Sequence, residues 1–507
     1  MFAQQSRDSL RSKLAVDDLA EAVVWEESAP HDKDEEDSRG LIARVRDREW
    51  MAALLLVLCD VTCWIGLYGL VAYLRRDIFF VGPFEFVLVD GVVLIVIVQA
   101  LYIIGGYNRN TEMRNLTYTT EHILAVAVAA AVSSLLIYSA AAYDAGMKPS
   151  RGVLLVSFIV FLPVSLFYRR LFRTHMAASA AQRAFLVVGG GDLARRFYEA
   201  YRQSPNRERL EFVDNDPARV GSTIAELGSP IVEGGLLAKL GHLDRRYSGV
   251  ILAESIDRLS PELIERLVRT QFQRTRVYTL ESFYESHWRH VPVHNIDPFW
   301  PLQMGFQLAR ISPYHYLKRL FDVLLSGALL VICSPLLVVI ALLIWLIDGR
   351  PIFFSQSRLG RENEPFVIHK FRTMVPRQES ENKDIYTRKG DPRVTRLGRL
   401  LRKFRLDEIP QLWNVLKGDM SLIGPRAEWE KCAERYEKAI PFYHFRHLVK
   451  PGITGWAQVN YPYGESDEDA IEKLKYDLYY IRHYSLKLDA MIVLKTVHTM
   501  LFCGGGR

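Results

Sequence analysis

The sequence predicts a membrane protein with three structured parts: a bundle of four transmembrane helices, a central α/β domain, and a mainly helical C-terminal domain with one further apolar helix. Four apolar stretches, at 51–74, 84–105, 119–142 and 152–168, have about the length that crosses a bilayer as a helix. A strand–glycine–helix pattern begins at residue 183 and opens a soluble segment. A fifth apolar run, 323–347, contains no charged residue.

The first part divides into a polar tail at 1–46 and the membrane segment at 47–175. The tail contains the acidic run 34–37 and lacks an apolar core near its start, so we expect a disordered segment and no cleavable signal peptide. Of the Lys and Arg residues near the predicted spans, eight fall on the side of the N-terminus and four on the other. This asymmetry predicts a cytoplasmic N-terminus, and four crossings return the chain to the cytoplasm.

The central part, 183–290, is predicted to be a Rossmann-like domain. In "RAFLVVGGGDLARRF", Gly189, Gly191 and Ala194 fit the pattern G-x-G-x-x-A, and a second strand ends at Asp214. These glycines and the acid are candidate nucleotide contacts, although a short glycine motif mostly marks the tight turn of a doubly wound sheet. Because the segment contains no Tyr-x-x-x-Lys pair, we interpret it as a regulatory or oligomerising module.

The fifth apolar run allows two topologies. A straight helix over its 25 residues would span roughly 37 Å and cross the bilayer. Ser334-Pro335 lies at its middle, where proline removes a backbone donor and bends a helix. Hydropathy alone favours the crossing, whereas the Arg- and Lys-rich tail favours a return to the cytoplasmic face, with Ser334 satisfying part of the freed backbone. We expect a re-entrant helix over 323–347, mainly on the family resemblance described below.

An acidic pair ends a strongly basic segment in the C-terminal part. Asp407 and Glu408 open "DEIPQLWNVLKGDMSLIGPR", directly after the basic run 388–405. Within that run, Leu397, Leu400, Leu401 and Phe404 have helical spacing, which predicts a basic amphipathic helix lying on an anionic membrane surface. An Asp-Glu pair by itself is usually a solvated surface feature, so the neighbouring motifs have to decide its meaning.

Those motifs carry a resemblance over 312–507. The matching stretches are "KRLFD", the Ser-Pro break, "FVIHKFRTM" (366–374), "RVTRLGRLLRKFRLDEIPQLWNVLKGDMSLIGPR" (393–426), "KPGITGWAQVN" (450–460) and "YDLYYIRHYSLKLD" (476–489). In these stretches the chain resembles the monotopic phosphoglycosyl transferases, the bacterial sugar transferases that start exopolysaccharide and O-antigen synthesis. Four spans followed by a nucleotide-binding-like module are similar to the long form of that family.

The resemblance implies transfer of a sugar-1-phosphate, with a hexose expected, from a UDP-sugar to polyprenyl (undecaprenyl) phosphate, with release of UMP. It implies that Asp407 is the nucleophile, that a covalent aspartyl-phosphosugar forms, and that Glu408 is a ligand of a Mg2+ cofactor. The chemistry of the residues agrees, because a carboxylate that attacks a diphosphate needs cations to neutralise the phosphate charge. Magnesium takes one or two carboxylates together with phosphate oxygens.

The remaining candidate site residues are basic or polar. Lys370, Arg372 and Arg426 are predicted to bind the diphosphate, although Ala427 stands where the family usually has the second proline of Pro-Arg-Pro. Gln458 is a nucleotide contact or part of a structural turn. For the polyprenyl phosphate we name the residues of the "KRLFD" motif, with membrane anchoring as the alternative for the two bases: Lys318, Arg319 and Asp322.

Two other functions were weighed. A membrane-bound NAD-dependent nucleotide-sugar dehydratase or epimerase would leave 312–507 unexplained, and a non-catalytic scaffold of polysaccharide assembly conflicts with the intact acidic pair. We expect a multi-pass protein of the bacterial inner membrane with its catalytic domain in the cytoplasm, joined to the central part by a linker at 291–311. The expected partners are the UDP-sugar, polyprenyl phosphate, membrane lipids and a second copy in a homodimer, and no nucleic acid.

Overall fold

The structure is a computed structural model of the 507-residue chain. It describes residues 49–76, 91–108, 111, 113, 116–140, 150–180, 183–204, 208–226, 228–241, 243, 247–255, 258–272, 275–293, 300, 306, 312–375, 391–461, 464 and 466–502. The predicted tail at 1–46 lies outside these residues.

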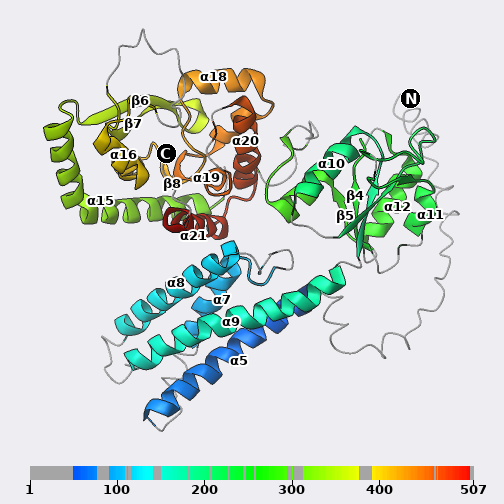
Figure 1. Ribbon diagram of the computed structural model, residues 1–507, viewed down its shortest axis with the longest axis horizontal. Helices are drawn as coiled ribbons and strands as arrows, with labels where there is room; N and C mark the ends of the chain where they lie inside the picture. Colours follow the sequence, from blue (N-terminus) through cyan, green and yellow to red (C-terminus); the bar gives the residue numbers. More distant parts are fainter. Residues whose placement is uncertain are drawn as a thin grey trace, which may run out of the picture. The chain divides into compact units, whose positions relative to one another are not determined.

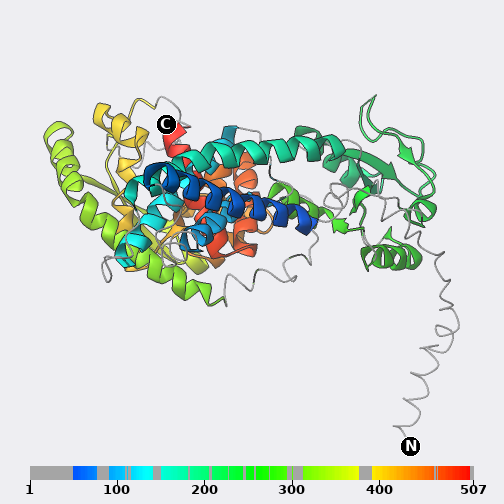
Figure 2. The ribbon, with the colours of Figure 1, turned by 90° about the horizontal axis from the view of Figure 1, so that it is seen from below.

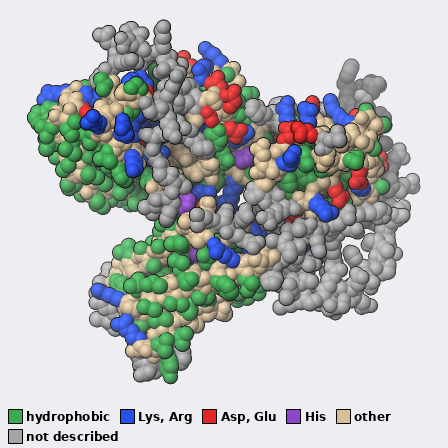
Figure 3. All heavy atoms as spheres, in the orientation of Figure 1, with side chains coloured by type: hydrophobic (Ala, Val, Ile, Leu, Met, Phe, Trp, Pro, Cys, Tyr) green, Lys and Arg blue, Asp and Glu red, His purple; other side chains and the backbone are tan. Residues whose placement is uncertain are grey.

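The N-terminal helices are α5 (Glu49–Arg76), α7 (Val93–Ile103), α8 (Leu116–Ala140) and α9 (Arg151–Ala180). Three of them are long and apolar enough to cross a membrane, and a fourth helix of that kind lies at Tyr314–Ile347. The 11-residue α7 is shorter, and most of the predicted span before it, 84–90, lies outside the described residues. On the face seen in Figure 3, hydrophobic side chains are spread along these helices and few charged ones are visible.

The lone charge of the first predicted span has a buried partner. Asp60 of α5 and Arg169 of α9 are both fully buried, and Arg169 NH2 lies 2.6 Å from Asp60 Oδ2. The Tyr107 hydroxyl donates a further hydrogen bond of 2.6 Å to the same carboxylate. Because a buried charge is tolerated only when paired, this contact holds α5 against α9 in one arrangement.

The central part is an α/β domain with a parallel sheet. Its five strands have the order β3-β2-β1-β4-β5, and each neighbouring pair is parallel (Figure 1). The strands are β1 (Ala184–Val188), β2 (Arg209–Val213), β3 (Val232–Glu233), β4 (Tyr247–Leu252) and β5 (Val277–Thr279). The helical elements are α10 (Asp192–Gln203), α11 (Leu236–Gly241), α12 (Pro261–Phe272), α13 (Leu280–Phe283) and the π-helical turn η4 (Tyr284–Trp288).

Strand β1 shows why this sheet is covered on both faces. Phe185 and Val187 belong to one core with residues of α10 and α13, while Leu186 and Val188 belong to another with residues of α11 and α12. All five residues of β1 are buried. Alternate residues of a strand point to opposite faces, so a strand covered on both sides has to be apolar throughout.

The C-terminal part combines short strand pairs with helices. Strands β6 (Phe353–Leu359) and β7 (Pro365–Phe371) pair antiparallel, and β8 (Ser421–Ile423) and β9 (Gly452–Thr454) pair parallel. The α-helices are α15 (Tyr314–Ile347), α16 (Arg396–Lys403), α17 (Gln411–Lys417), α18 (Glu430–Ala439), α19 (Trp456–Asn460), α20 (Asp467–Arg482) and α21 (Leu486–Phe502). The short turns are η7 (Arg361–Asn363), η9 (Leu406–Glu408) and η10 (Tyr443–Leu448).

The fifth apolar run forms one continuous helix, α15, with Pro335 inside it. The helix changes direction along its length in both ribbon views (Figures 1 and 2). Pro335 has no N–H to offer the carbonyl of Val331, and the Ser334 hydroxyl donates to that carbonyl at 2.8 Å. The predicted compensation by serine is therefore present, on a helix that bends without being interrupted.

Two expectations about segments differ from the structure in detail. In the predicted linker, Val291, Val293, Trp300 and Phe306 are buried in the main core of the C-terminal part, so these residues belong to that core. In α16 the apolar stripe divides: Leu401 packs on Phe371 and Ile344, whereas Leu400 and Phe404 remain 53% and 60% exposed. Leu401 therefore belongs to the protein core, whereas Leu400 and Phe404 form an exposed apolar edge.

Candidate active site

The acidic pair lies in η9, a single turn between α16 and α17. Arg405, just before it, has a left-handed backbone with φ 54°, which turns the chain sharply after α16. Asp407 and Glu408 are each only 8% exposed. Two adjacent carboxylates held this far from water require either cations or a function that uses their charge.

Glu408 is surrounded by cations from separate segments. Lys370 of β7 places Nζ 2.6 Å from Glu408 Oε1, Arg426 NH2 lies 3.3 Å from the same oxygen, and Arg405 NH1 lies 3.6 Å from Oε2. Burial raises the pKa of Glu408, but the Lys370 and Arg426 charges outweigh it and hold that pKa well below its usual range. Glu408 is therefore ionised and fixed in place.

Asp407 has a different environment. Among the residues that the structure describes, no Lys, Arg or His side chain lies within ion-pair distance of its carboxylate. Burial, and then the neighbouring Glu408 charge, raise the pKa of Asp407, with Lys370 opposing them. A buried carboxylate without a bound cation keeps its electron pairs available, which is the condition for a nucleophile.

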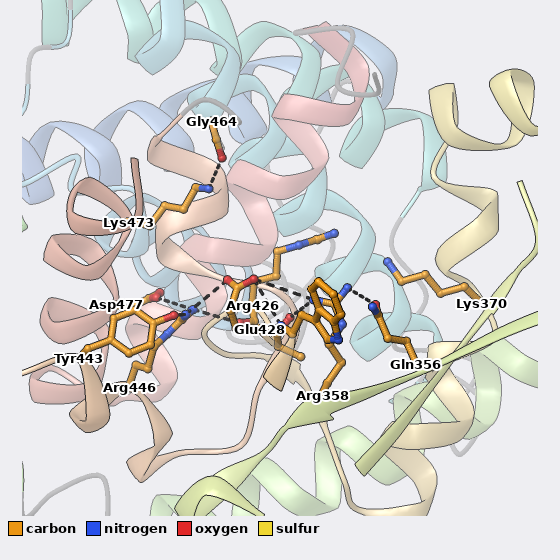
Figure 4. Close-up of polar contacts among 12 residues, drawn as sticks. Gln356, Arg358, Lys370, Arg426, Glu428, Tyr443, Arg446, Gly464, Lys473 and Asp477 are labelled. Carbon is orange, nitrogen blue, oxygen red and sulfur yellow. Dashed lines mark hydrogen bonds and ion pairs between the residues drawn. The ribbon is translucent and has the colours of Figure 1, made fainter. Parts of the chain in front are cut away.

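A network of buried charges holds the chain at Arg426. Arg446 donates to the Arg426 carbonyl at 3.0 Å, and Arg358 donates to the Ala427 carbonyl at 3.2 Å. Arg446 is in turn paired with Asp477 at 3.0 Å, and both side chains are buried. Figure 4 shows this network and the Lys370 and Arg426 side chains that extend beyond it. Two arginines thus fix the backbone where the family usually has a second proline.

Sequence reasoning missed the members of this network, which come from β6, η10 and α20. Glu428 lies between Arg446 at 3.6 Å and Arg358 at 4.0 Å. Lys473 donates to the Gly464 carbonyl at 2.5 Å, and burial lowers its pKa (Figure 4). The available signal was a lone Asp477 in the otherwise apolar and aromatic stretch "DLYYI", since a charge there needs a buried partner.

Arg372, which is predicted to bind the diphosphate, contacts backbone carbonyls of the protein. Its guanidinium donates to the carbonyls of Asp348, Gly349 and Arg350 at 2.5, 2.8 and 2.7 Å, respectively. These carbonyls follow the C-terminus of α15, where orphan acceptors and the helix dipole favour a cation. Arg372 therefore caps a helix, and its fork geometry is already used by the protein itself.

The three residues of "KRLFD" also have partners within the protein. Lys318 forms a buried ion pair with Asp489, and Arg319 donates to the carbonyls of Val415 and Leu416 at 2.5 and 2.7 Å. Asp322 Oδ1 accepts the backbone N–H of Leu422 at 3.0 Å. These contacts join the start of α15 to α21, to the end of α17 and to β8, in that order. The acidic pair, in contrast, precedes the start of α17.

Gln458 lies in α19, and its amide nitrogen donates to the Ile453 carbonyl at 3.0 Å. This contact closes the turn that precedes α19. Its Oε1 is buried without a hydrogen-bond partner within the described part of the chain. The structure thus gives Gln458 the turn-forming contact that the sequence left as one of two alternatives.

Side chains of the central domain form hydrogen bonds and ion pairs at its glycine turn. Asp214 accepts the Gly190 N–H at 2.8 Å and the Asp216 N–H at 3.0 Å. Arg219 then bridges Asp214 at 3.1 Å and Glu254 at 2.6 Å. Burial raises the pKa of Asp214, but these hydrogen bonds and Arg219 bring it below its usual value.

Comparison with known proteins relates the C-terminal part to one family. The sequence model described as "Bacterial sugar transferase" matches residues 313–503. One relative is a UDP-N-acetylgalactosamine-undecaprenyl-phosphate N-acetylgalactosaminephosphotransferase of Aeromonas hydrophila. The two sequences are 40% identical over 263 residues, and this alignment covers 52% of this chain and 61% of the relative. It is 43% identical over 182 residues to a UDP-glucose:undecaprenyl-phosphate glucose-1-phosphate transferase of Klebsiella pneumoniae, covering 36% of this chain and 39% of the relative.

A shorter relative is matched almost completely. The exopolysaccharide production protein PSS of Rhizobium leguminosarum bv. phaseoli is 38% identical over 195 residues, which are 38% of this chain and 98% of that protein. The matched regions contain the acidic pair and the segments that surround it. The predicted family is therefore confirmed, and the chain belongs to the bacterial sugar transferases.

Proposed function

We propose that this protein transfers a sugar-1-phosphate from a UDP-sugar to polyprenyl phosphate and releases UMP, as the first step of exopolysaccharide or O-antigen synthesis. The observation that carries the proposal is the contrast within the acidic pair. Glu408 is held by Lys370 and Arg426, while Asp407 beside it is buried and has no cation within ion-pair distance among the described residues. This arrangement suits attack by a carboxylate on phosphorus.

In the first half-reaction, a carboxylate oxygen of Asp407 attacks the phosphorus that carries the sugar. A bond forms between that oxygen and phosphorus, the phosphorus–oxygen bond to UMP breaks, and UMP leaves with the electron pair. Lys370 and Arg426 lie on the Glu408 side of the pair, where their charges offset those of the diphosphate. The resulting aspartyl-phosphosugar is a mixed anhydride and remains reactive.

In the second half-reaction, a phosphate oxygen of the polyprenyl phosphate attacks the same phosphorus. The bond to Asp407 breaks, and the carboxylate is regenerated as the polyprenyl diphosphate sugar forms. Burial of Asp407 keeps water away from the anhydride between the two steps. The same nucleophile can therefore serve both substrates in turn.

Magnesium is the proposed cofactor. Among the described residues no cluster of three or more His, Cys, Asp or Glu side chains could hold a metal ion, so protein ligands alone would be too few. The Glu408 carboxylate would hold the ion, because magnesium takes one or two carboxylates when phosphate oxygens complete its shell. When bound, the ion would neutralise charge on the diphosphate.

We propose the re-entrant topology for α15. The start of the helix is tied to α17 through Arg319, and its end packs through Ile344 on Phe371 and Leu401. Both ends thus contact one domain, whereas a straight helix of 34 residues would separate its ends by about 50 Å. This supports a catalytic domain that stays on the cytoplasmic face of the inner membrane.

For the central domain we propose a Rossmann-like module with a regulatory or oligomerising role. The parallel strand order β3-β2-β1-β4-β5 is that of doubly wound nucleotide-binding folds, which supports the fold. The internal contacts of Asp214 and Arg219 favour a role that does not involve redox turnover. A homodimer and contacts with membrane lipids complete the proposal.

The test is to incubate the purified protein with Mg2+, polyprenyl phosphate and a panel of UDP-sugars, and to measure UMP. The panel should include UDP-glucose, UDP-galactose and UDP-N-acetylgalactosamine. We expect UMP release with at least one donor and dependence on both Mg2+ and the lipid. Failure with every donor, in a preparation whose folding is confirmed by thermal unfolding, would remove the proposal.

A further inference from the structure

A basic pocket lies at the start of α15, away from the acidic pair. It is lined by His315, Lys318, Arg319 and Asp322 of that helix, and by Arg361 and Lys450 from other segments. Of these, Lys318 and Arg319 have the internal partners described above. Arg361 and Lys450 are not part of the "KRLFD" motif, and they lie far from it in the chain.

The cations of this pocket are only partly compensated. Arg361 NH2 forms a 3.3 Å ion pair with the exposed Glu362, but the buried Nε of Arg361 has no hydrogen-bond partner within the described part of the chain. Among the described residues, no carboxylate lies within 4 Å of Lys450 Nζ. Burial, and then the charge of Arg319, lower the pKa of Lys450; Asp322 opposes this decrease and Arg361 adds to it. Burial, Arg361 and Lys450 do the same for His315. Positive groups that disfavour one another in this way create a local field that favours an anion.

The pocket is separated from the acidic pair by the length of α17. Arg319 binds the carbonyls at the C-terminal end of that helix, and Glu408 precedes its N-terminal end. The seven residues of α17 correspond to about 10 Å. An anion in the pocket would therefore not be the phosphate that Asp407 attacks.

The pocket lies at the point where α15 becomes apolar. On α15, the last residue that lines the pocket is Asp322, and the uncharged run of the helix starts at residue 323. On the same turns, Tyr316, Leu320 and Phe321 are exposed, Tyr316 to 80%. A ligand with a phosphate head and an apolar chain matches both the basic pocket and the apolar surface beside it.

We propose that this pocket binds the phosphate group of a lipid, through Arg361 and Lys450. The phosphate could belong to a membrane phospholipid or to polyprenyl phosphate waiting outside the reaction centre. The phospholipid source is independent of the proposed function, whereas the polyprenyl source rests on it. Lys318, Arg319 and Asp322 line the pocket, and their partners in α21, α17 and β8 fix its shape.

The test uses full-length protein in detergent with Arg361→Gln, Lys450→Gln and the double variant. Lys438→Gln, on the exposed face of α18, is the matched control for loss of one charge. Native mass spectrometry measures retained phosphatidylglycerol, with phosphatidylcholine as the neutral comparison. Steady-state kinetics measure KM for polyprenyl phosphate and for the UDP-sugar, and thermal unfolding checks that each variant is folded.

We expect the double variant to lose at least about tenfold in one of two affinities, since a charge-assisted hydrogen bond commonly contributes that much. Reduced phosphatidylglycerol retention identifies the phospholipid. A higher KM for polyprenyl phosphate with an unchanged KM for the UDP-sugar identifies the acceptor. Wild-type values for both, or an equal loss in Lys438→Gln, would overturn the proposal. Absence of UMP release from the wild type would instead remove the proposed function and leave the retention measurement valid.

Discussion

The acidic pair and the glycine turn of the central domain each contain an aspartate and nearby arginines, yet the two aspartates have opposite environments. Asp214 accepts two backbone N–H groups and pairs with Arg219, so its charge is consumed by the turn itself. In the acidic pair the cations gather on Glu408, and Asp407 has none within ion-pair distance among the described residues. The pKa of Asp214 is lowered, whereas that of Asp407 is raised.

This difference teaches how to separate a structural acid from a reactive one. A carboxylate whose hydrogen bonds are satisfied stabilises its own loop and has little left to offer a ligand. A carboxylate kept buried beside a second, fixed charge retains its electron pairs and is the better candidate for chemistry. Four substitutions would test this difference, from the largest expected effect to the smallest.

Asp407→Asn should lower UMP release more than about 1000-fold, because it removes the nucleophile. Asp214→Asn, the matched change in the central domain, should leave the rate within about twofold. Intact-mass spectrometry after mixing with a UDP-sugar should detect a phosphosugar adduct on the wild type and none on Asp407→Asn. A near-wild-type rate for Asp407→Asn would refute the nucleophile assignment.

Lys370→Met should lower kcat roughly 100-fold, because it removes a charge that fixes Glu408 and offsets the diphosphate. It should also move the acidic limb of the pH–kcat profile. Lys370 lowers the pKa of Asp407, so its loss raises that pKa further, and the ionised nucleophile is lost at a higher pH. Lys417→Met, at an exposed position of α17, is the control and should leave the limb in place. An acidic limb of the pH–kcat profile that does not shift, or that shifts to lower pH, would contradict this role of Lys370.

Arg446→Lys should lower kcat about tenfold. The lysine keeps the positive charge next to Asp477, but a single ammonium cannot reproduce the fork that also reaches the Arg426 carbonyl. The acidic limb should remain unchanged, since Asp407 is not affected directly. Arg435→Lys alters an exposed pair with Asp467 and serves as the control. Equal rates for the two variants would show that Arg446 does not position Arg426.

Arg219→Gln should have the smallest effect, within about twofold on turnover. The arginine is partly exposed and its pairs with Asp214 and Glu254 contribute about 1 kcal/mol or less to stability, which a small fall in Tm would report. A change in kcat of tenfold or more would instead show that the glycine turn communicates with the transferase domain. That result would weaken the distinction drawn between the two aspartates.

Much of the candidate site could be predicted from the sequence because its motifs are local. Asp407 and Glu408 are adjacent, and Lys370 and Arg426 were named with them, so their meeting at Glu408 agrees with the expected chemistry. Arg372 belongs to the same motif as Lys370 and is predicted to bind the same diphosphate, yet it caps α15. A sequence shows which side chains can bind phosphate, but not which of them the folded backbone has already occupied.

The sequence by itself determined the apolar helices, the uninterrupted apolar run of β1, and the proline with its compensating serine, because these depend on neighbours within a few residues. Only the tertiary structure decided that Arg446 and Asp477 hold Arg426, and that Arg361 and Lys450 meet the "KRLFD" residues in one pocket. These contacts join segments far apart in the chain, and an ionised side chain acquires its role from the partners that burial leaves within its reach.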